Sequence, residues 1–277
     1  MKDKVVVVTG ASDGIGAAAV RQFANLGARV VVVGRSPDKT QRVAAALGAD
    51  YYTADFSSLA EVRALAAKLV GRYPAIDVLA NNAGGSWPTR QTTIDGHELT
   101  FAVNHLAPFL LTTLLHDALA AAQGRVVMTS SSASWFGRVQ LDDLEAAHGT
   151  YRSMRVYGTT KLENILMARE IARQWTTEGI TATAFHPGIV ATQFGRDSRI
   201  AHQIFGGVFK GLLRTPEQAA QTLVWLASAP LEELVNGGYY KGRRVAKTTA
   251  QANDAALAQA LWEQSAELVN SPAGLVE

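Results

Sequence analysis

Short runs of valine and other β-branched residues alternate with helical segments through most of this chain, and that alternation restricts the fold more than any other feature. The runs are almost continuously apolar, as in VVVV at 5–8 and RVVVVG at 29–34. Strands of this kind are buried on both faces, which requires a parallel sheet covered by helices on each side. Further strands are expected near 50–55 and at 76–81, 124–129, 180–185 and 237–242.

The pattern predicts an α/β fold: one Rossmann-type, doubly wound parallel sheet of about seven strands with helices on both faces. No composition break or internal repeat divides the 277 residues, so a single domain is expected over 1–277. Helix starts are predicted at Ser36-Pro37 and Thr215-Pro216, where a polar cap precedes proline, and at the capping-box pattern Ser58-Leu-Ala-Glu61. The stretch 193–214 has many glycines and aromatics but little periodicity, and is a candidate lid or a surface excursion.

The overall composition excludes several classes of function. A net charge of +2 gives no broad electrostatic basis for binding nucleic acid or an anionic membrane. The absence of cysteine excludes disulfides, thiolate metal sites and cysteine nucleophiles, and the histidines show no compact ligand spacing with carboxylates, so no metal site is expected. No apolar run is long enough to span a membrane, and MKDKVVVVTG does not resemble a signal peptide, so a cytoplasmic protein is expected.

The first predicted strand leads directly into TGASDGIG at 9–16, and a helix follows at once. Glycines at this spacing allow a sharp turn and a close approach of the backbone to a pyrophosphate, and the N–H groups and dipole at a helix N-terminus favour an anion. A plain β-to-α turn is the alternative, but the position between a strand and a helix favours nucleotide binding. The candidate contacts are Gly10, Ser12, Asp13, Gly14, Ile15 and Gly16.

The end of the second strand bears on the choice between NAD and NADP. NAD-binding proteins of this architecture place a carboxylate there for the ribose hydroxyls. This chain has Arg35 and Ser36 instead, and a guanidinium and a hydroxyl are suited to a 2′-phosphate. Asp38 could still serve a ribose, so the sequence favours NADP and leaves NAD as the less favoured cofactor.

The stretch YRSMRVYGTTK at 151–161 contains two tyrosines, each followed four residues later by a basic residue. Tyr151 precedes Arg155, and Tyr157 precedes Lys161. In a helix each pair lies on one face, one turn apart. The spacing alone does not decide whether either pair takes part in chemistry.

Several motifs in order resemble the short-chain dehydrogenase/reductase family. They are TGASDGIG, NNAG at 81–84, VNHLAPFLLT, RVVMTSSS, YGTTK at 157–161 and HPGIVAT at 186–192. KLENILMARE and ALWEQSAEL are most similar to the retinol-dehydrogenase-like and WW-domain-oxidoreductase-like branch. The resemblance covers essentially the whole chain, and it implies that 1–130 is mainly the cofactor-binding half and 131–277 mainly the catalytic and substrate-binding half.

The resemblance implies a catalytic set of Asn104, Ser131, Tyr157 and Lys161. Tyr157 would exchange a proton with the substrate oxygen, and Lys161 together with the charge of the nicotinamide would bring the pKa of the phenol closer to neutrality. Ser131 would hold the carbonyl oxygen, and Asn104 would hold a water that links Lys161 to solvent.

The segment between the serine and the tyrosine is longer than in many members of the family. Ser130 and Ser132 flank Ser131 and are alternatives for its role. Residues 135–152 would form part of the substrate wall, with Trp135 and Phe136 as apolar contacts or as parts of a packed surface loop.

The resemblance also implies further contacts with the cofactor. Asp55 would bond the adenine amine, the NNAG turn would lie against the adenosine, and Ile189 and Thr192 would hold the nicotinamide carboxamide. His186 is expected to support its loop and not to act as a general acid. The full set of cofactor contacts beyond the first two strands is Asp55, Phe56, Asn81, Ala83, Gly84, Tyr157, Lys161, Pro187, Gly188, Ile189 and Thr192.

The expected function is therefore an NADP(H)-dependent oxidoreductase that transfers a hydride between nicotinamide and an apolar carbonyl or alcohol substrate, with reduction favoured. The alternatives are a non-catalytic NADP-binding sensor or scaffold and, less favoured because a GxxGxxG spacing is missing, a dehydratase or epimerase. The apolar faces of 101–122 and 151–177 fit a homodimer or homotetramer as well as they fit burial in the core.

Overall fold

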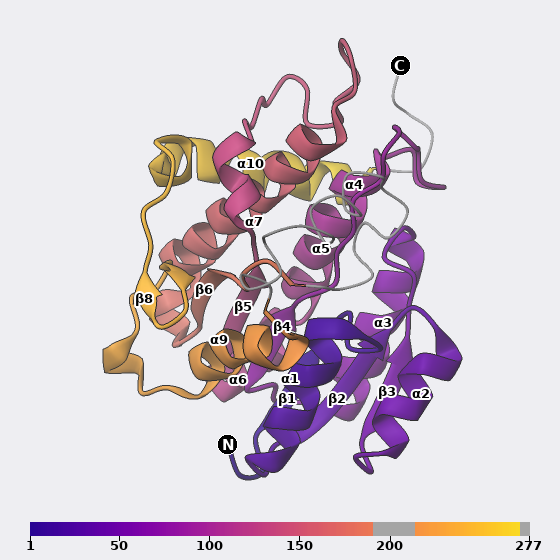
Figure 1. Cartoon of the computed structure of the whole chain (residues 1–277), viewed down its shortest axis with the longest axis vertical. Coiled ribbons are helices and arrows are strands. Elements are labelled where there is room, and N and C mark those ends of the chain that lie inside the picture. Colours follow the sequence, from indigo (N-terminus) through magenta and orange to yellow (C-terminus); the bar gives the residue numbers. More distant parts are fainter. Residues whose placement is uncertain (191–213, 272–277) are drawn as a thin grey trace.

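The computed structural model describes residues 1–190 and 214–271. A single eight-stranded sheet forms the centre of the molecule, with the strand order β3-β2-β1-β4-β5-β6-β7-β8, and Figure 1 shows it running from β3 at the right to β8 at the left. The strands are β1 (Val5–Val8), β2 (Arg29–Gly34), β3 (Asp50–Thr53), β4 (Val78–Asn81), β5 (Arg125–Thr129), β6 (Thr181–His186), β7 (Tyr239–Lys241) and β8 (Arg244–Val245).

The first seven strands are parallel, as the continuous apolar runs predict, and the Rossmann-type doubly wound architecture is confirmed. β8 was not expected. It pairs antiparallel with β7, and the two-residue connection begins at Gly242, whose φ of +63° suits a tight hairpin. Because β8 is only two residues long and polar at its start, it has no apolar run by which the sequence could reveal it.

Helices cover both faces of the sheet (Figure 1), and two apolar clusters fill the space between the layers. One layer consists of α1 (Gly14–Asn25), α2 (Pro37–Ala45) and α9 (Pro216–Ser228), and α1 packs along α9. The other layer consists of α3 (Leu59–Arg72), α4 (Leu99–Phe101), the π-helical turn Ala102–Leu106, α5 (Ala107–Leu114), α6 (His116–Ala122), α7 (Ser153–Trp175) and α10 (Ala255–Asn270).

The three predicted helix starts are present, with one difference in detail. Thr215 and Gln218 form a complete capping box at the start of α9. At α3 the box is only half formed, because Ser58 accepts from the N–H of Glu61 while the carboxylate of Glu61 accepts from the N–H of Asp55, 2.8 Å away. Glu61 therefore fastens the chain that leaves β3 to the first turn of α3.

The candidate lid at 193–214 lies almost entirely outside the described residues. Its base is defined, because the N–H of Arg214 donates to the carbonyl of Ile189 at 2.8 Å and Val190 forms a parallel bridge with Arg214. Within the described parts of the chain, no single helix is long and apolar enough to cross a membrane, although the bent pair Leu99–Leu114 and His116–Ala122 would pass on length and composition together.

Candidate active site

The catalytic residues expected from the sequence meet at the carboxyl ends of β4 and β5. Ser131 follows β5, Tyr157 and Lys161 lie on α7, and Asn104 lies in the π-helical turn before α5. The Lys161 ammonium stands 5.5 Å from the centre of the Tyr157 ring. In open parallel sheets, ligands bind at the carboxyl ends of the strands, next to the point where the strand order reverses. Here that point lies between β1 and β4, because β2 and β3 extend the sheet to one side and β5 to β8 extend it to the other.

Tyr157 and Ser131 interact directly through their side chains. Burial raises the pKa of the Tyr157 phenol to about 12, and the hydrogen bond with Ser131 opposes that rise. The Ser131 oxygen also accepts from the N–H of Ala133 at 3.2 Å, so its own hydroxyl proton is left to donate toward the site. At neutral pH the phenol therefore carries its proton, as a group that protonates a carbonyl oxygen must.

Lys161 is buried, with 3% of its surface exposed, and its ammonium donates to the carbonyl of Thr129 at 3.2 Å. Burial lowers the pKa of Lys161 to about 8. The expected fall in the pKa of Tyr157 depends on Lys161 and on the charge of the nicotinamide together; in the chain alone, burial of the phenol has the largest effect on its pKa. The site holds a protonated acid next to a destabilised cation.

Asn104 connects the turn after β4 to α7. Its side-chain amide accepts from the N–H of Gly85 at 2.7 Å and donates to the carbonyl of Gly85 at 2.9 Å and to the hydroxyl of Thr160 at 3.0 Å. The helix widens to a π turn at Asn104, and Pro108 has no N–H to donate to the Asn104 carbonyl four residues earlier. These bonds account for a buried asparagine inside a helix.

Gly84 shows how closely these groups converge. A Cβ built on Gly84 would lie 2.9 Å from the Asn104 amide oxygen and 3.2 Å from the Lys161 ammonium. Any side chain at this position would crowd both groups, which explains why the turn after β4 contains glycine here.

The two serines that flank Ser131 have other partners. The Ser130 hydroxyl is buried and donates to the carbonyl of Lys161 at 2.6 Å, which ties β5 to α7. Ser132 is exposed, and its backbone N–H donates to Nδ1 of His186 at 3.2 Å. Of the three, Ser131 is the one whose hydroxyl meets the Tyr157 phenol.

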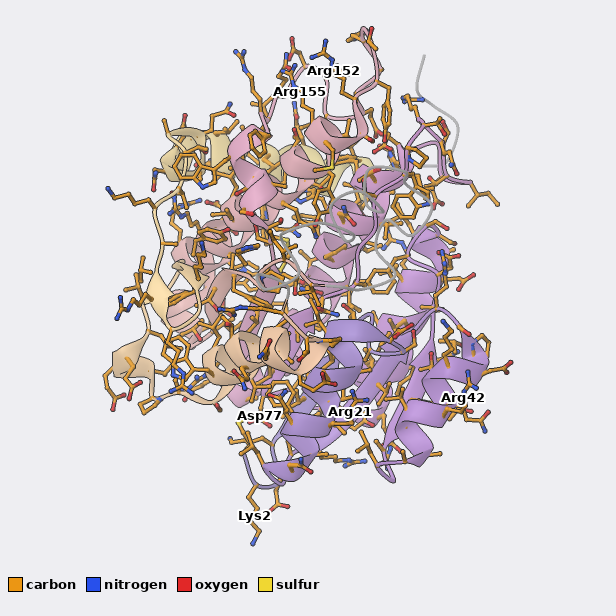
Figure 2. The ribbon with its side chains drawn as sticks, in the orientation of Figure 1. Lys2, Arg21, Arg42, Asp77, Arg152 and Arg155 are labelled. Atoms are coloured by element: carbon orange, nitrogen blue, oxygen red, sulfur yellow. The ribbon has the colours of Figure 1, made fainter. Side chains whose placement is uncertain are left out.

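The second tyrosine pair lies outside the site. The Tyr151 hydroxyl donates to the carboxylate of Glu98 at 3.0 Å, and Arg155 is exposed on the outer surface of the molecule, as Figure 2 shows. Tyr151 therefore fastens the loop before α7 to the start of α4, and Arg155 donates to the side chain of Gln140 at 3.5 Å.

The glycine-rich turn forms a compact backbone cradle before α1. Gly10 and Gly14 have positive φ values of +63° and +55°, and a Cβ on Gly16 would lie 2.3 Å from the carbonyl oxygen of Gly10. Asp13 caps α1 by accepting from the N–H of Gly14 at 2.7 Å. A loop folded this closely on the helix start presents backbone rather than side chains to a bound phosphate.

Sequence reasoning missed the residues that hold this cradle in place. The Asn82 amide donates to the carbonyl of Thr9 at 3.0 Å, and the Thr9 hydroxyl accepts from the N–H groups of Asn82 and Ala83, both at 3.0 Å. Asn81 faces the other way, into the core, where its amide donates to Thr112 at 2.8 Å. The NNAG motif contains both asparagines, and nothing in the motif distinguishes their directions.

A second positive charge, Lys39 at the start of α2, lies near the cradle and was not expected from the sequence. Arg35 is exposed, and Gly34 packs against Ser12 so closely that a Cβ on Gly34 would lie 2.8 Å from the Ser12 side chain. Lys39, one turn into α2, reaches back to the carboxylate of Asp13 at 3.5 Å. Lys39 thus contacts the glycine-rich turn from α2, and Arg35 directly follows Gly34, which packs against that turn.

The remaining predicted contacts lie around the same edge of the sheet. The carboxylate of Asp55 accepts from the backbone and hydroxyl of Ser57, at 2.9 and 2.8 Å, and Phe56 is buried in the core. Pro187 is buried, Gly188 has a φ of +95°, and Ile189 is 54% exposed. Thr192 lies outside the described residues.

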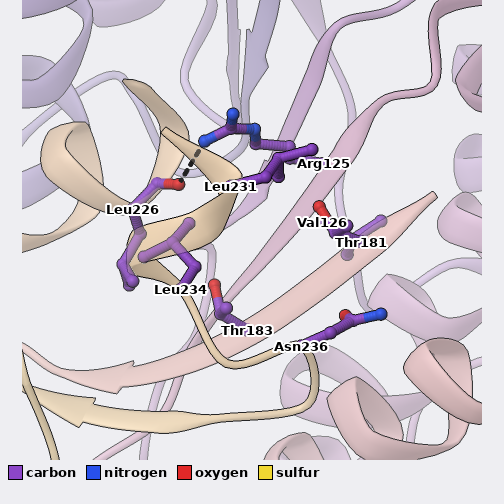
Figure 3. Close-up of a pocket in the computed structure, with 8 residues that line it drawn as sticks. All are labelled: Arg125, Val126, Thr181, Thr183, Leu226, Leu231, Leu234 and Asn236. Atoms are coloured by element: carbon purple, nitrogen blue, oxygen red, sulfur yellow. Dashed lines mark hydrogen bonds between the residues drawn. The ribbon is translucent and has the colours of Figure 1, made fainter. Parts of the chain in front are cut away.

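A small cavity of about 50 Å³ lies away from this site and is lined by residues near the amino ends of β5 and β6 (Figure 3). The guanidinium of Arg125 donates there to the carbonyls of Leu226 and Ala229, at 3.2 and 2.6 Å, and so closes the C-terminal end of α9. The cavity has room for water but not for a nicotinamide or a multi-ring ketone. Among the described residues, no cluster of three or more histidines and carboxylates is arranged to hold a metal.

Comparison with known proteins places the chain in a family. The model of the short chain dehydrogenase family matches residues 4–203, and the chain belongs to that family. Within it, the chain falls in the retinol-dehydrogenase-like branch. Human retinol dehydrogenase 13 is 36% identical over 281 residues, which cover 96% of this chain and 84% of that protein.

Other relatives extend the comparison to bacteria and to solved structures. DnrU of Streptomyces sp. (strain C5), whose name assigns it provisionally as a daunorubicin C-13 ketoreductase, is 46% identical over 98% of this chain and 94% of its own length. An uncharacterized protein from Mycobacterium paratuberculosis superimposes with a TM-score of 0.79 at 30% identity, covering 99% of this chain and 96% of that one. A Beutenbergia cavernae protein named provisionally as an NAD(P)-dependent gluconate 5-dehydrogenase, with NADP bound at low occupancy, has a TM-score of 0.71 at 27% identity, covering 86% of this chain and 94% of that one.

Proposed function

We propose that this protein is an NADP(H)-dependent reductase of apolar ketones or aldehydes. The convergence of Ser131, Tyr157 and Lys161 at the carboxyl end of the sheet supports this proposal most strongly. A hydride acceptor needs a proton donor and a second hydrogen-bond donor at the carbonyl oxygen, and these three side chains supply such groups.

The chain fits a nicotinamide cofactor at this edge. The cradle before α1 would receive the pyrophosphate, and the bound cofactor supplies the hydride. Tyr157 then donates its proton to the carbonyl oxygen, and Ser131 donates a hydrogen bond that stabilises the negative charge developing there. Lys161 favours the phenolate that forms, and Asn104 would hold a water through which a proton returns to Tyr157 by way of Lys161.

The preference for NADP rests on charge at the end of β2. Arg35 and Lys39 together offer two cations near the glycine-rich turn, whereas a carboxylate suited to the ribose hydroxyls of NAD is absent from position 35. Asp13 repels a 2′-phosphate unless Lys39 neutralises it, so the ion pair between them removes an obstacle to NADP.

The preference for an apolar substrate rests on the turn that follows Ser131. Trp135 and Phe136 are 52% and 75% exposed, and both belong to the short 3-10 helix that starts next to Ser131. The names of two relatives, a retinol dehydrogenase and the provisional daunorubicin C-13 ketoreductase, refer to apolar or multi-ring substrates, which supports the same class.

A non-catalytic NADP sensor is less well supported because Tyr157 and Lys161 occur together. Lys161 would contact the cofactor in either case, but binding of a dinucleotide alone does not need a buried, destabilising ammonium beside a phenol that meets the Ser131 hydroxyl. The oxidoreductase accounts for both groups.

Turnover and binding assays test the proposal together. Oxidation of NADPH and of NADH would be followed at 340 nm against a panel of ketones and aldehydes that range from polar to multi-ring. Affinities for 2′,5′-ADP and 5′-AMP would be measured by calorimetry on the same preparation. The proposal predicts turnover with NADPH, tighter binding of 2′,5′-ADP, and higher kcat/KM for apolar substrates; tight binding with no turnover across the panel would favour the sensor.

A further inference from the structure

His186 ends β6 and is 6% exposed, and the proposed function gives it no proton to exchange with the substrate. Its Nδ1 accepts a hydrogen bond of 3.2 Å from the backbone N–H of Ser132. In chain order, Pro187 and Gly188 follow His186 directly and begin the segment expected to hold the nicotinamide. The residue therefore stands between the serine turn and the cofactor segment.

The backbone on both sides of Ser131 is fixed by β6. The N–H of Ser130 donates to the carbonyl of Phe185 at 2.8 Å, which continues the parallel pairing of β5 with β6. One residue beyond Ser131 that pairing ends, because Ser132 opens a 3-10 turn. The first N–H groups of a helical turn have no partner within the turn, and here the imidazole of His186 supplies the acceptor.

We propose that His186 is a positioning residue, which acts as a neutral hydrogen-bond acceptor that holds the Ser131–Ser132 backbone so that the Ser131 hydroxyl points at the Tyr157 phenol. The inference rests on the proposed function, since it gives Ser131 the role of carbonyl donor. Removing the acceptor frees one end of the turn and displaces the hydroxyl from the reacting oxygen.

The charges around His186 keep it in the form that can accept. Burial, together with the positive charges of Lys241 and Arg214, lowers the pKa of His186 to about 4. Lys241 is the residue of β7 paired with His186, and the Arg214 side chain lies against Gly188, where a Cβ would come within 2.6 Å of it. A protonated imidazole would instead present an N–H to the N–H of Ser132 and break the bond.

A purely structural histidine would behave differently from a positioning residue. Loss of a packing residue lowers the stability and the cofactor affinity of the protein along with its turnover. Loss of the acceptor for Ser132 lowers kcat while NADPH affinity stays unchanged, and it is repaired by any side chain that restores an acceptor at the position of Nδ1. The asparagine oxygen lies close to that position, so His186→Asn is the conservative variant and His186→Leu the disruptive one.

Two measurements on the full-length protein test the proposal. The first is the 15N NMR spectrum of the labelled histidine side chains, which reports tautomer and protonation without any need for turnover. The resonances of His186 are assigned by their loss in His186→Asn. The proposal predicts that His186 carries its proton on Nε2 and stays neutral down to about pH 5. A proton on Nδ1 would overturn it.

The second measurement is the steady-state rate with NADPH, together with the Kd for NADPH. His186→Leu should lower kcat by about 10- to 100-fold with the Kd within twofold of wild type, and His186→Asn should recover most of the loss. Lys241→Met should raise the pKa of His186 and move the acid limb of kcat to higher pH, while the exposed Lys247→Met, a matched control, should move neither.

The outcomes separate this inference from the function on which it rests. A wild-type kcat in His186→Leu, or an equal loss of kcat and NADPH affinity, would refute the positioning role. If His186→Leu does not fold, the kcat–pH profile of Lys241→Met decides instead: an acid limb at the same pH as in the wild type would refute the positioning role. If the wild-type protein turns over no carbonyl at all, the proposed function fails, and the NMR spectrum alone decides the contact between His186 and Ser132.

Discussion

Replacing Lys161 by methionine should abolish turnover and yet make the protein more stable at neutral pH. The ammonium is buried, and its pKa is lowered from 10.5 to about 8. At 1.36 kcal/mol per pH unit, that difference corresponds to about 3 kcal/mol of destabilisation by the charge. Loss of the hydrogen bond to Thr129 costs about 1 kcal/mol in the opposite direction, so a net gain of about 2 kcal/mol is expected at pH 7.

The pH dependence identifies the cause. Below pH 8 the lysine is protonated in both the folded and unfolded states, so the destabilisation is fully present. As pH rises from 8 to 10.5 the folded state loses its proton first, and the destabilisation disappears. The advantage of Lys161→Met should therefore fall to around zero near pH 10.

Urea unfolding at pH 7 and at pH 10 measures this directly, with the exposed Lys68→Met as control. The control should shift the midpoint little at either pH. If Lys161→Met proves less stable than wild type at pH 7, or if its advantage does not change with pH, the account of a strained catalytic cation is refuted.

Two further variants test other charges in the structure. Glu163 is fully buried, neither of its carboxylate oxygens has a hydrogen-bond partner in the described part of the chain, and burial followed by the charges of nearby carboxylates holds its pKa well above 4.5. Below pH 4.5 the carboxyl is protonated in both the folded and the unfolded state, and above pH 4.5 the unfolded state loses the proton first, so the free energy of unfolding of the wild type falls as pH rises toward the raised pKa. In thermal or urea unfolding, Glu163→Gln should therefore become more stable relative to wild type by about 1.36 kcal/mol for each pH unit above 4.5. A difference that does not change with pH, or the same slope in the exposed Glu267→Gln, would contradict this. Arg35→Ala should weaken binding of 2′,5′-ADP by about 10- to 100-fold in calorimetry and leave the affinity for 5′-AMP unchanged. The exposed Arg42→Ala on α2 should change neither affinity. Equal losses of affinity for the two nucleotides would show that Arg35 does not contact a 2′-phosphate.

Much of the fold could be predicted because each buried strand corresponds to a run of apolar residues in the sequence. VVVV and RVVVVG are apolar on both faces and become β1 and β2 in the interior of the sheet. β8 has only two residues at the edge, and no hydrophobic pattern can be read from so short a segment. The half-formed capping box at Ser58 has a similar cause, since the pattern does not show that Asp55 competes for the Glu61 carboxylate.

The site was predicted less completely than the fold because motifs name positions and not directions. Asn81 and Asn82 are neighbours, and side chains of neighbouring residues at a strand end point to opposite faces. Asn82 holds the glycine-rich turn while Asn81 enters the core, and only the packing of β4 against α5 decides between them. The pKa of Tyr157 shows a related limit: the sequence shows the cation beside the phenol, but burial, which raises the pKa of the phenol in the chain alone, is a property of the whole fold.

The central claim is that Tyr157, and not Tyr151, is the proton donor of a carbonyl reductase. The most direct test is kcat for NADPH-dependent reduction of an apolar ketone in Tyr157→Phe and in Tyr151→Phe, with the Kd for NADPH measured in both. Tyr157→Phe should lose about 10²- to 10⁴-fold in kcat with little change in the Kd, because only the acid is removed. Tyr151→Phe, which loses a bond to the buried Glu98 and none to Ser131 or Lys161, should keep most of its activity. Substantial turnover in Tyr157→Phe would contradict the account.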